Sequence, residues 1–163
     1  QCSLNQKEKI MEYIKIGKEE GAELLIGGDV YQSETNPNGF YIQPTLFKGH
    51  NKMRIFQEEI FGPVMSVLSF KSEEEVIMRA NDTEFGLSAG VFTQDIKRAH
   101  RVIAEIQAGT CWINNYNITP IEAPFGGDKN TGIGRENSLA AIEYYTQLKA
   151  VYVEMGEADC PHP

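Results

Sequence analysis

Hydrophobic and polar residues recur with a helical period at the start of the chain. Within "QKEKIMEYIKIGKEEG", Ile10, Met11 and Ile14 share one face, while Lys and Glu fill the other. Gly21 follows as a candidate C-terminal cap. "AELLIGG" then predicts a short strand ended by glycines, and "FYIQPTLF" predicts an extended segment in which Pro44 indicates a sheet edge. The first part of the chain is therefore expected to form a helix followed by two extended segments.

Strand-like and helical patterns alternate after the turn at "FGP". "VMSVLSF" is a nearly continuous apolar run, typical of a strand buried on both faces. Ser72 and Glu75 then form a capping box that begins a helix. "LSAGVFT" predicts a second strand, Asp95 caps the helix "IKRAHRVIAEIQA", and "GTCWINNY" predicts a third strand. Strands separated by helices are joined by right-handed crossovers, so the pattern predicts an α/β fold with an open, mostly parallel sheet and flanking helices.

The remaining residues predict a loop, a helix and a last strand. "PFGGDKNTGIGRE" is glycine-rich, "NSLAAIEYYTQ" predicts a helix capped by Asn137, and "KAVYVEM" alternates as a strand does. The tail "GEADCPHP" is expected to be frayed. We therefore divide the chain into an α/β portion, residues 1–147, and a terminal strand with its tail, residues 148–163. Alone, that strand would present an exposed edge.

Composition and charge exclude several classes of protein. The 163 residues fit one domain, and a net charge of −8 argues against nucleic-acid binding, which needs a basic face. No apolar run approaches the roughly 20 residues that span a bilayer, so no membrane partner is expected. Cys2, Cys111 and Cys160 are widely spaced and form neither a CxxC site nor a disulfide framework. This usage favours a reducing compartment, and we predict a cytoplasmic location.

Two segments are candidates for a functional site, although neither by itself indicates which reaction the protein would catalyse. "QEEIFGPV", residues 57–64, places paired acids, an aromatic residue and a Gly-Pro turn directly before a predicted strand. The glycine-rich loop lacks G-x-G-x-x-G because Asn137 occupies the third position after "GIG". A tight loop that needs positive φ is the plainer interpretation of its glycines. The histidines are scattered, and Cys111 lies in a predicted buried strand, where an inert thiol is expected.

The order and spacing of the motifs resemble the C-terminal part of an aldehyde dehydrogenase. The matching segments are "QEEIFGPV", "ANDTEFGLSAGVFT", "AGTCWINNYN", "PFGG" and "GRE". Within that family, "AGTCWINNYNITPIEAPFGG" is most similar to the branch of betaine aldehyde and trimethylaminobutyraldehyde dehydrogenases. The resemblance implies NAD(P)⁺-dependent oxidation of betaine aldehyde, or of a related trimethylamino aldehyde, to its acid. It also implies that the nucleophilic cysteine, the general base and the dinucleotide-binding domain precede residue 1, so this chain alone is expected to be inactive.

The resemblance implies roles for five residues. Glu59 would accept hydrogen bonds from the nicotinamide ribose hydroxyls, and Phe61 would pack beside the cofactor. Phe125 would line the aldehyde pocket, where an aromatic ring can face a quaternary ammonium group, and Thr119 matches another part of the pocket wall. Glu136 would belong to a proton relay.

The resemblance also implies a cation site and subunit contacts. Lys129 and Gly132 match positions whose carbonyl oxygens help to hold a monovalent cation, K⁺, between subunits. Asp128 replaces the usual aromatic residue after "GG", and Thr131 replaces the usual serine. The last strand resembles the family's oligomerisation segment, which implies a homo-oligomer as well as contact with the rest of the parent enzyme.

Two alternatives remain open at this stage. An aldehyde dehydrogenase for semialdehyde acids would need a cation in the substrate pocket, and Phe125 with Thr119 supplies none. The chain could instead be a non-enzymatic interaction module that uses its edge strand. The choice between NAD⁺ and NADP⁺ cannot be derived, because the adenosine-ribose pocket would lie in the preceding domain.

Overall fold

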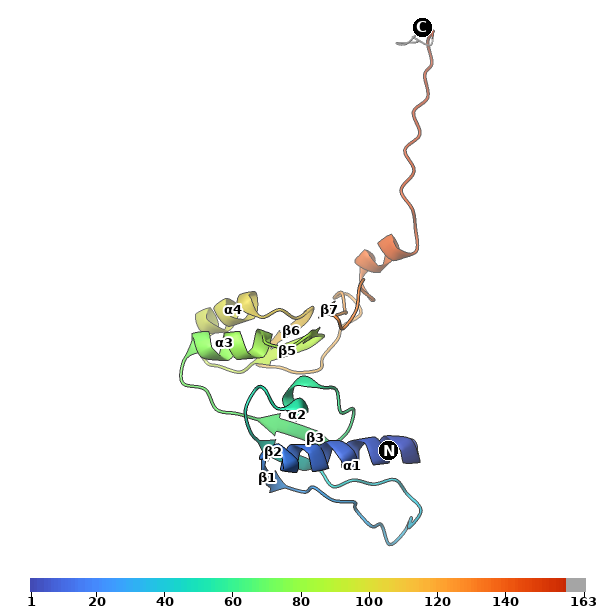
Figure 1. Cartoon of the computed structure of the whole chain (residues 1–163). Helices are drawn as coiled ribbons and strands as arrows, with labels where there is room; N and C mark the ends of the chain where they lie inside the picture. Colours follow the sequence, from blue (N-terminus) through green and yellow to red (C-terminus); the bar gives the residue numbers. More distant parts are fainter. Residues whose placement is uncertain (158–163) are drawn as a thin grey trace.

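The computed structural model describes residues 1–157 as two lobes followed by an extended arm (Figure 1). The first lobe contains α1 (Leu4–Glu19), β1 (Glu23–Ile26), β2 (Thr45–Lys48), α2 (Arg54–Gln57) and β3 (Val64–Val67). The second lobe contains α3 (Glu73–Asn81), β4 (Phe85–Gly86), β5 (Ser88–Val91), α4 (Ile96–Glu105), β6 (Thr110–Ile113) and β7 (Asp128–Lys129). A short 3₁₀ helix, η1 (Leu139–Tyr144), leads into the arm. Across residues 1–157, no helix is long and apolar enough to cross a membrane.

The first lobe is a small three-stranded sheet packed against α1. β2 is the central strand, antiparallel to β1 and parallel to β3. Ile10 and Ile14 of α1 are fully buried with Phe47 of β2, which makes them the centre of the hydrophobic core. The helical spacing seen in the sequence therefore identifies the buried face of α1 correctly.

The second lobe places two helices beside a parallel strand pair. β5 and β6 are parallel, and α4 contacts both strands. Glu73, in the first turn of α3, forms ion pairs with Arg98 and Arg101 of α4 and thereby ties the two helices together. The antiparallel pair of β4 and β7 joins the segment after α3 to the glycine-rich loop.

The α/β class is confirmed, and so are the predicted starts of α3 and α4. Ser72 Oγ accepts a hydrogen bond from Glu75 N at 3.2 Å, and Asp95 Oδ1 accepts one from Arg98 N at 3.0 Å. Gly21, with φ +85°, follows the last residues of α1, as expected of a glycine after a helix end. These signals depend on neighbouring residues, which is why the sequence suffices to detect them.

The parallel pairs lie in separate sheets, and three details of the predicted strands are wrong. β3 pairs with β2 in the first lobe and does not join β5 and β6. It is an edge strand in which Met65 is 63% exposed, so it is not buried on both faces. Pro44 does not mark an edge, because it precedes Thr45 and β2 lies between two neighbours.

The predictions for the chain end change as well. The helix predicted after the glycine-rich loop is only η1, and Ser138 caps it, not Asn137. Residues 148–157 form no strand, because a strand needs the backbone groups of a neighbour and this arm extends away from both lobes (Figure 1). The rest of the predicted tail, with Cys160, lies outside the described residues.

Candidate functional site

The turn after α2 is anchored to α1. Glu58 N donates to Arg54 O at 2.8 Å, which ends the helix, and Phe61 follows in a left-handed conformation with φ +56°. That conformation is uncommon for a residue with a side chain. The side-chain amide of Gln6 donates to Phe61 O. Thr45 N donates to Pro63 O at 2.8 Å, so the turn is tied to both α1 and β2.

Glu58 is a structural acid. Its carboxylate accepts hydrogen bonds from Arg54 Nε at 2.7 Å and Arg54 Nη2 at 2.9 Å, and from the Tyr13 hydroxyl at 2.7 Å. The bonds from Arg54, followed by that from Tyr13, lower the pKa of Glu58 to about 2. The same carboxylate raises the pKa of Tyr13. Glu58 thus fixes the turn to α1 and has no free acceptor role.

The neighbouring acid, Glu59, differs from Glu58 in that its carboxylate is not engaged by any described residue. Its side chain is exposed and, among residues 1–157, its carboxylate forms no hydrogen bond. Phe61 is 71% exposed two residues further on. A free carboxylate and an aromatic ring therefore project from a rigid turn. Such a carboxylate can accept charge-assisted hydrogen bonds from a diol.

The glycine-rich loop is a second ordered unit. Phe125 N donates to Glu136 O at 2.8 Å, and Glu136 N donates to Phe125 O at 2.7 Å. Arg135 Nη1 donates to Gly127 O at 3.0 Å, while Arg135 Nη2 forms an ion pair with Asp128 Oδ1 at 2.6 Å. Asp128, a departure from the family pattern, thus has a structural partner inside the loop.

Three predicted site residues line one cavity of about 410 Å³ in this region. Phe125, Gly132 and Glu136 contribute to its wall, and Tyr144 of η1 and its C-cap Tyr145 complete it. Sequence reasoning missed the two tyrosines, although "EYYTQ" was visible as a paired aromatic motif. The structure therefore groups an aromatic ring and a carboxylate that the sequence separates by ten intervening residues.

The other predicted residues lie outside this cavity. Thr119 is exposed on the loop between β6 and β7, and Glu59 with Phe61 belongs to the first lobe. A larger cavity of about 570 Å³ between α3, α4 and β5 contains none of the predicted site residues. Burial raises the pKa of the Cys111 thiol, which agrees with an inert cysteine.

The predicted cation-binding segment is held by side-chain contacts as well as by the backbone pairing of β7 with β4. Lys129 Nζ donates to Asn81 O at 2.8 Å and to Thr83 O at 3.0 Å. Thr131 Oγ1 accepts a hydrogen bond from Gly86 N at 2.8 Å, so this second departure from the family pattern is also accommodated. Gly132 is exposed. Among residues 1–157, no three His, Cys, Asp or Glu side chains gather into a metal-binding group.

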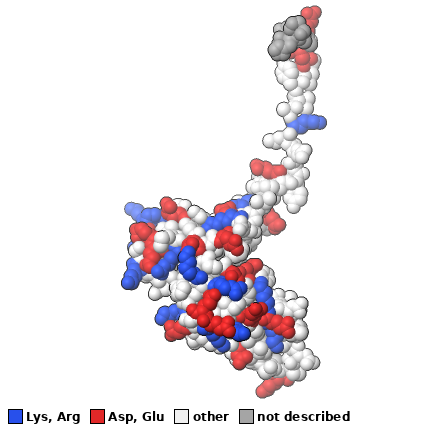
Figure 2. Space-filling model, in the orientation of Figure 1, with Lys and Arg blue, Asp and Glu red and all other residues white. Residues whose placement is uncertain are grey.

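Charges of both signs are mixed on the visible surface of the two lobes. Figure 2 shows Lys and Arg side chains interspersed with Asp and Glu on both lobes. A continuous basic stripe, which nucleic-acid binding would need, is not seen on this face of residues 1–157.

The fold and these two ordered segments are those of an aldehyde dehydrogenase: a model described as the Aldehyde dehydrogenase family matches residues 1–151, and the chain belongs to this family. It is 63% identical over 158 residues to betaine aldehyde dehydrogenase of Mesorhizobium japonicum, covering 96% of the chain and 32% of that relative. The identity to betaine aldehyde dehydrogenase of Brucella anthropi is 60% over 158 residues, with the same coverage of 96% and 32%. The chain spans about a third of the length of these relatives.

Solved structures agree with this assignment. The NAD⁺ complex of aldehyde dehydrogenase from Bacillus cereus superimposes with a TM-score of 0.90 at 46% identity, covering 94% of the chain and 31% of that structure. Betaine aldehyde dehydrogenase from Staphylococcus aureus, in complex with NAD⁺, gives a TM-score of 0.85 at 40% identity, covering 88% and 28%.

Proposed function

We propose that this chain is part of an NAD(P)⁺-dependent aldehyde dehydrogenase that oxidises betaine aldehyde, or a related trimethylamino aldehyde, to its acid. The observation that carries the proposal is the 63% identity to a betaine aldehyde dehydrogenase over 158 residues. NAD⁺ is the favoured cofactor, because similar solved structures are NAD⁺ complexes. The chain would supply the C-terminal part of the enzyme, and a cytoplasmic location is proposed with it.

In this proposal, the turn after α2 binds the nicotinamide half of the cofactor. The free carboxylate of Glu59 accepts hydrogen bonds from the ribose hydroxyls, and the exposed ring of Phe61 packs beside the cofactor. When bound, the cofactor supplies the hydride acceptor. The fit rests on a rigid turn, since Gln6 and Glu58 anchor it while Glu59 remains free.

The aldehyde would be bound through its charged end. Phe125, together with Tyr144 and Tyr145, offers aromatic faces to a trimethylammonium group, and Glu136 adds a negative charge at the same cavity. We propose that Glu136 also acts in a proton relay, and that Thr119 forms a separate part of the pocket wall. Arg135 also lines this cavity, but its guanidinium is already paired with Asp128, so the charge of Glu136 disfavours a substrate with a terminal carboxylate.

A monovalent cation and a second subunit complete the proposal. The carbonyl oxygens of Lys129 and Gly132 would help to bind K⁺, and hard oxygen ligands suit such an ion.

The arm would add to a sheet edge of another copy. Its side chains Leu148, Val151 and Tyr152 are 105%, 75% and 86% exposed. Such apolar side chains favour burial against a partner. Val151→Lys places a charge among these apolar side chains. Sedimentation velocity should then show weaker self-association of the 163-residue chain.

The test replaces the matching third of the Mesorhizobium japonicum enzyme with this chain. The chimera should reduce NAD⁺ in the presence of betaine aldehyde and should prefer this substrate to succinic semialdehyde. The 163-residue chain alone should show no turnover. A folded chimera that prefers succinic semialdehyde, or oxidises neither aldehyde, would contradict the proposed substrate.

The paired acids provide a matched control within the chimera. Glu59→Gln removes a charge-assisted hydrogen bond and should raise KM for NAD⁺ about tenfold to a hundredfold. Glu58→Gln should change KM for NAD⁺ much less, because the glutamine carbonyl oxygen can still accept from Arg54 or Tyr13 and keep the turn in place. Equal effects of the two substitutions would contradict the assignment of Glu59.

A further inference from the structure

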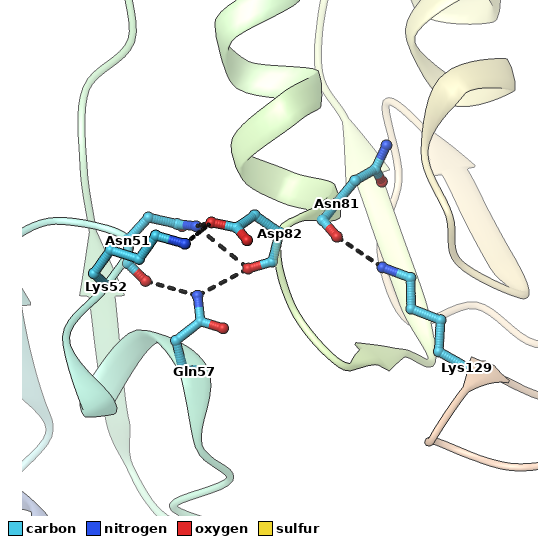
Figure 3. A network of polar contacts seen from close by, with 6 residues as sticks. All are labelled: Asn51, Lys52, Gln57, Asn81, Asp82 and Lys129. Carbon is cyan, nitrogen blue, oxygen red and sulfur yellow. Dashed lines mark hydrogen bonds and ion pairs between the residues drawn. The ribbon is translucent and has the colours of Figure 1, made fainter.

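A single turn after α3 is held from both lobes at once. α3 ends at Asn81, and Asp82 follows as its C-cap. From the first lobe, Gln57 Nε2 donates to Asp82 O at 2.9 Å and to Asn51 O at 2.6 Å (Figure 3). Asn51 Nδ2 and Lys52 Nζ reach Asp82 Oδ2 at 3.0 and 2.8 Å. We call residues 81–83 the α3 exit turn.

Lys129 holds the same turn from the glycine-rich loop. Its ammonium group donates to Asn81 O (Figure 3) and to Thr83 O, the carbonyl groups on either side of Asp82. Carbonyl groups at a helix end lack partners within the helix, and a cation there is electrostatically favoured. Lys129 therefore adds a charged donor at this helix end, where Asn81 O also accepts a hydrogen bond from Thr83 N at 2.9 Å.

The end of α4 supplies a third attachment. Asn81 Nδ2 donates to Glu105 O at 2.8 Å, and Gln107 N donates to Asn81 Oδ1 at 2.8 Å. The exit turn is thus fixed within the second lobe by Asn81, while Gln57 and Lys129 reach it from two other segments. All these contacts share the same short backbone stretch.

Gln57 and Lys129, which contact the exit turn from outside, belong to the two candidate functional segments. Gln57 immediately precedes the turn that displays Glu59 and Phe61, and Lys129 lies within the loop that displays Phe125. We propose that Gln57, Asp82 and Lys129 are positioning residues, which hold the turn at 58–62 and the loop at 125–136 in one arrangement through the α3 exit turn. The consequence for catalysis rests on the proposed function of Glu59, whereas the coupling itself does not.

A purely local role for Lys129 makes a different prediction from this coupling. If Lys129 only orders its own loop, its loss should loosen residues 125–136 alone. If the exit turn couples the segments, its loss should also loosen residues 57–62, and loss of Gln57 should loosen the loop in return. Coupling between two sites is reciprocal, so both directions must be observed.

Hydrogen exchange with mass spectrometry on the 163-residue chain tests the proposal without cofactor. Lys129→Met removes the ammonium group but keeps a side chain of similar length. We expect about fivefold faster amide exchange at residues 57–62, which is the effect of losing one typical net hydrogen bond. Gln57→Leu should accelerate exchange at residues 125–136 by a similar factor. Lys129→Arg, which can still donate to both carbonyl groups, should restore slow exchange.

The matched control is Lys48→Met. Lys48 forms an exposed ion pair with Glu23 between two strands of the first lobe, at 3.2 Å, so its loss removes the same type of charge without touching the exit turn. It should leave exchange in both segments unchanged. Acceleration confined to the mutated segment, in either the Lys129 or the Gln57 variant, overturns the proposal. Because no aldehyde or cofactor is present, this result is independent of whether the chimera oxidises betaine aldehyde.

Discussion

Replacing Gly62 with alanine tests how closely α1 packs on the turn that displays Glu59 and Phe61. A Cβ atom at Gly62 would lie 2.4 Å from Ile10 Cδ1 and 2.6 Å from Ile10 Cγ1. Both distances are too short for carbon atoms, and Ile10 is fully buried, so it has no free space to enter. The φ angle of Gly62 lies outside the left-handed region, so the expected effect is steric.

The magnitude follows from the cost of overpacking a core. An extra methyl group in a filled core destabilises a protein by about 1–3 kcal/mol, against a total stability of roughly 5–15 kcal/mol for a domain. Urea denaturation followed by far-UV circular dichroism measures this loss. Gly132→Ala is the control, because no atom lies within 4 Å of the Cβ it would add. That variant should stay within about 0.5 kcal/mol of the parent.

A double-mutant cycle identifies the cause. Ile10→Ala alone removes the clashing atoms and should destabilise the chain by about 2–5 kcal/mol through the cavity it leaves. On that background, Gly62→Ala should cost nearly nothing, because the added methyl group enters the vacated space. The coupling free energy should therefore equal most of the single Gly62→Ala penalty. Equal penalties in both backgrounds would refute a steric contact between α1 and the turn.

Three further predictions concern the anchored segments. Arg54→Met removes the larger of the two hydrogen-bond contributions, from Arg54 and Tyr13, that lower the pKa of Glu58 to about 2 from its ordinary 4.5. A carboxyl group with a lowered pKa stabilises the fold at any pH above its ordinary pKa. As the pH falls from 4.5 to 2 in an acid titration, the difference in free energy of unfolding between the parent and this variant should therefore disappear. At neutral pH this difference should stay below about 1 kcal/mol because the pair is exposed. Ser72→Ala should destabilise the chain by about 1 kcal/mol in thermal denaturation through loss of the α3 cap, while Ser69→Ala should not. Arg135→Leu should accelerate hydrogen exchange throughout the glycine-rich loop, since it removes the contacts with two carbonyl groups and Asp128; unchanged exchange would show that the loop is ordered by its backbone alone.

Residues of the candidate site were predictable to different degrees. The motif around Glu59 and the loop around Phe125 were visible in the sequence, and the family resemblance suggested their roles. The contacts that order them were not visible. Tyr13 and Glu58 are 45 positions apart, and Gln6 and Phe61 are 55 positions apart. Side-chain pairs at such separations leave no local pattern, so only the folded chain reveals which of the paired acids is engaged.

The sequence by itself determined the three main helices of this protein. Helical spacing predicted the buried face of α1, and Ser72 and Asp95 marked the starts of α3 and α4, because these signals involve residues within one turn of each other. The tertiary structure decided how the strands are grouped, that β3 belongs to the first lobe, and that Glu58 is bound while Glu59 is free. It also brought Gln57 and Lys129 to the same exit turn. These features depend on contacts between segments far apart in the chain, where packing and the pairing of backbone groups, not local preference, select the arrangement.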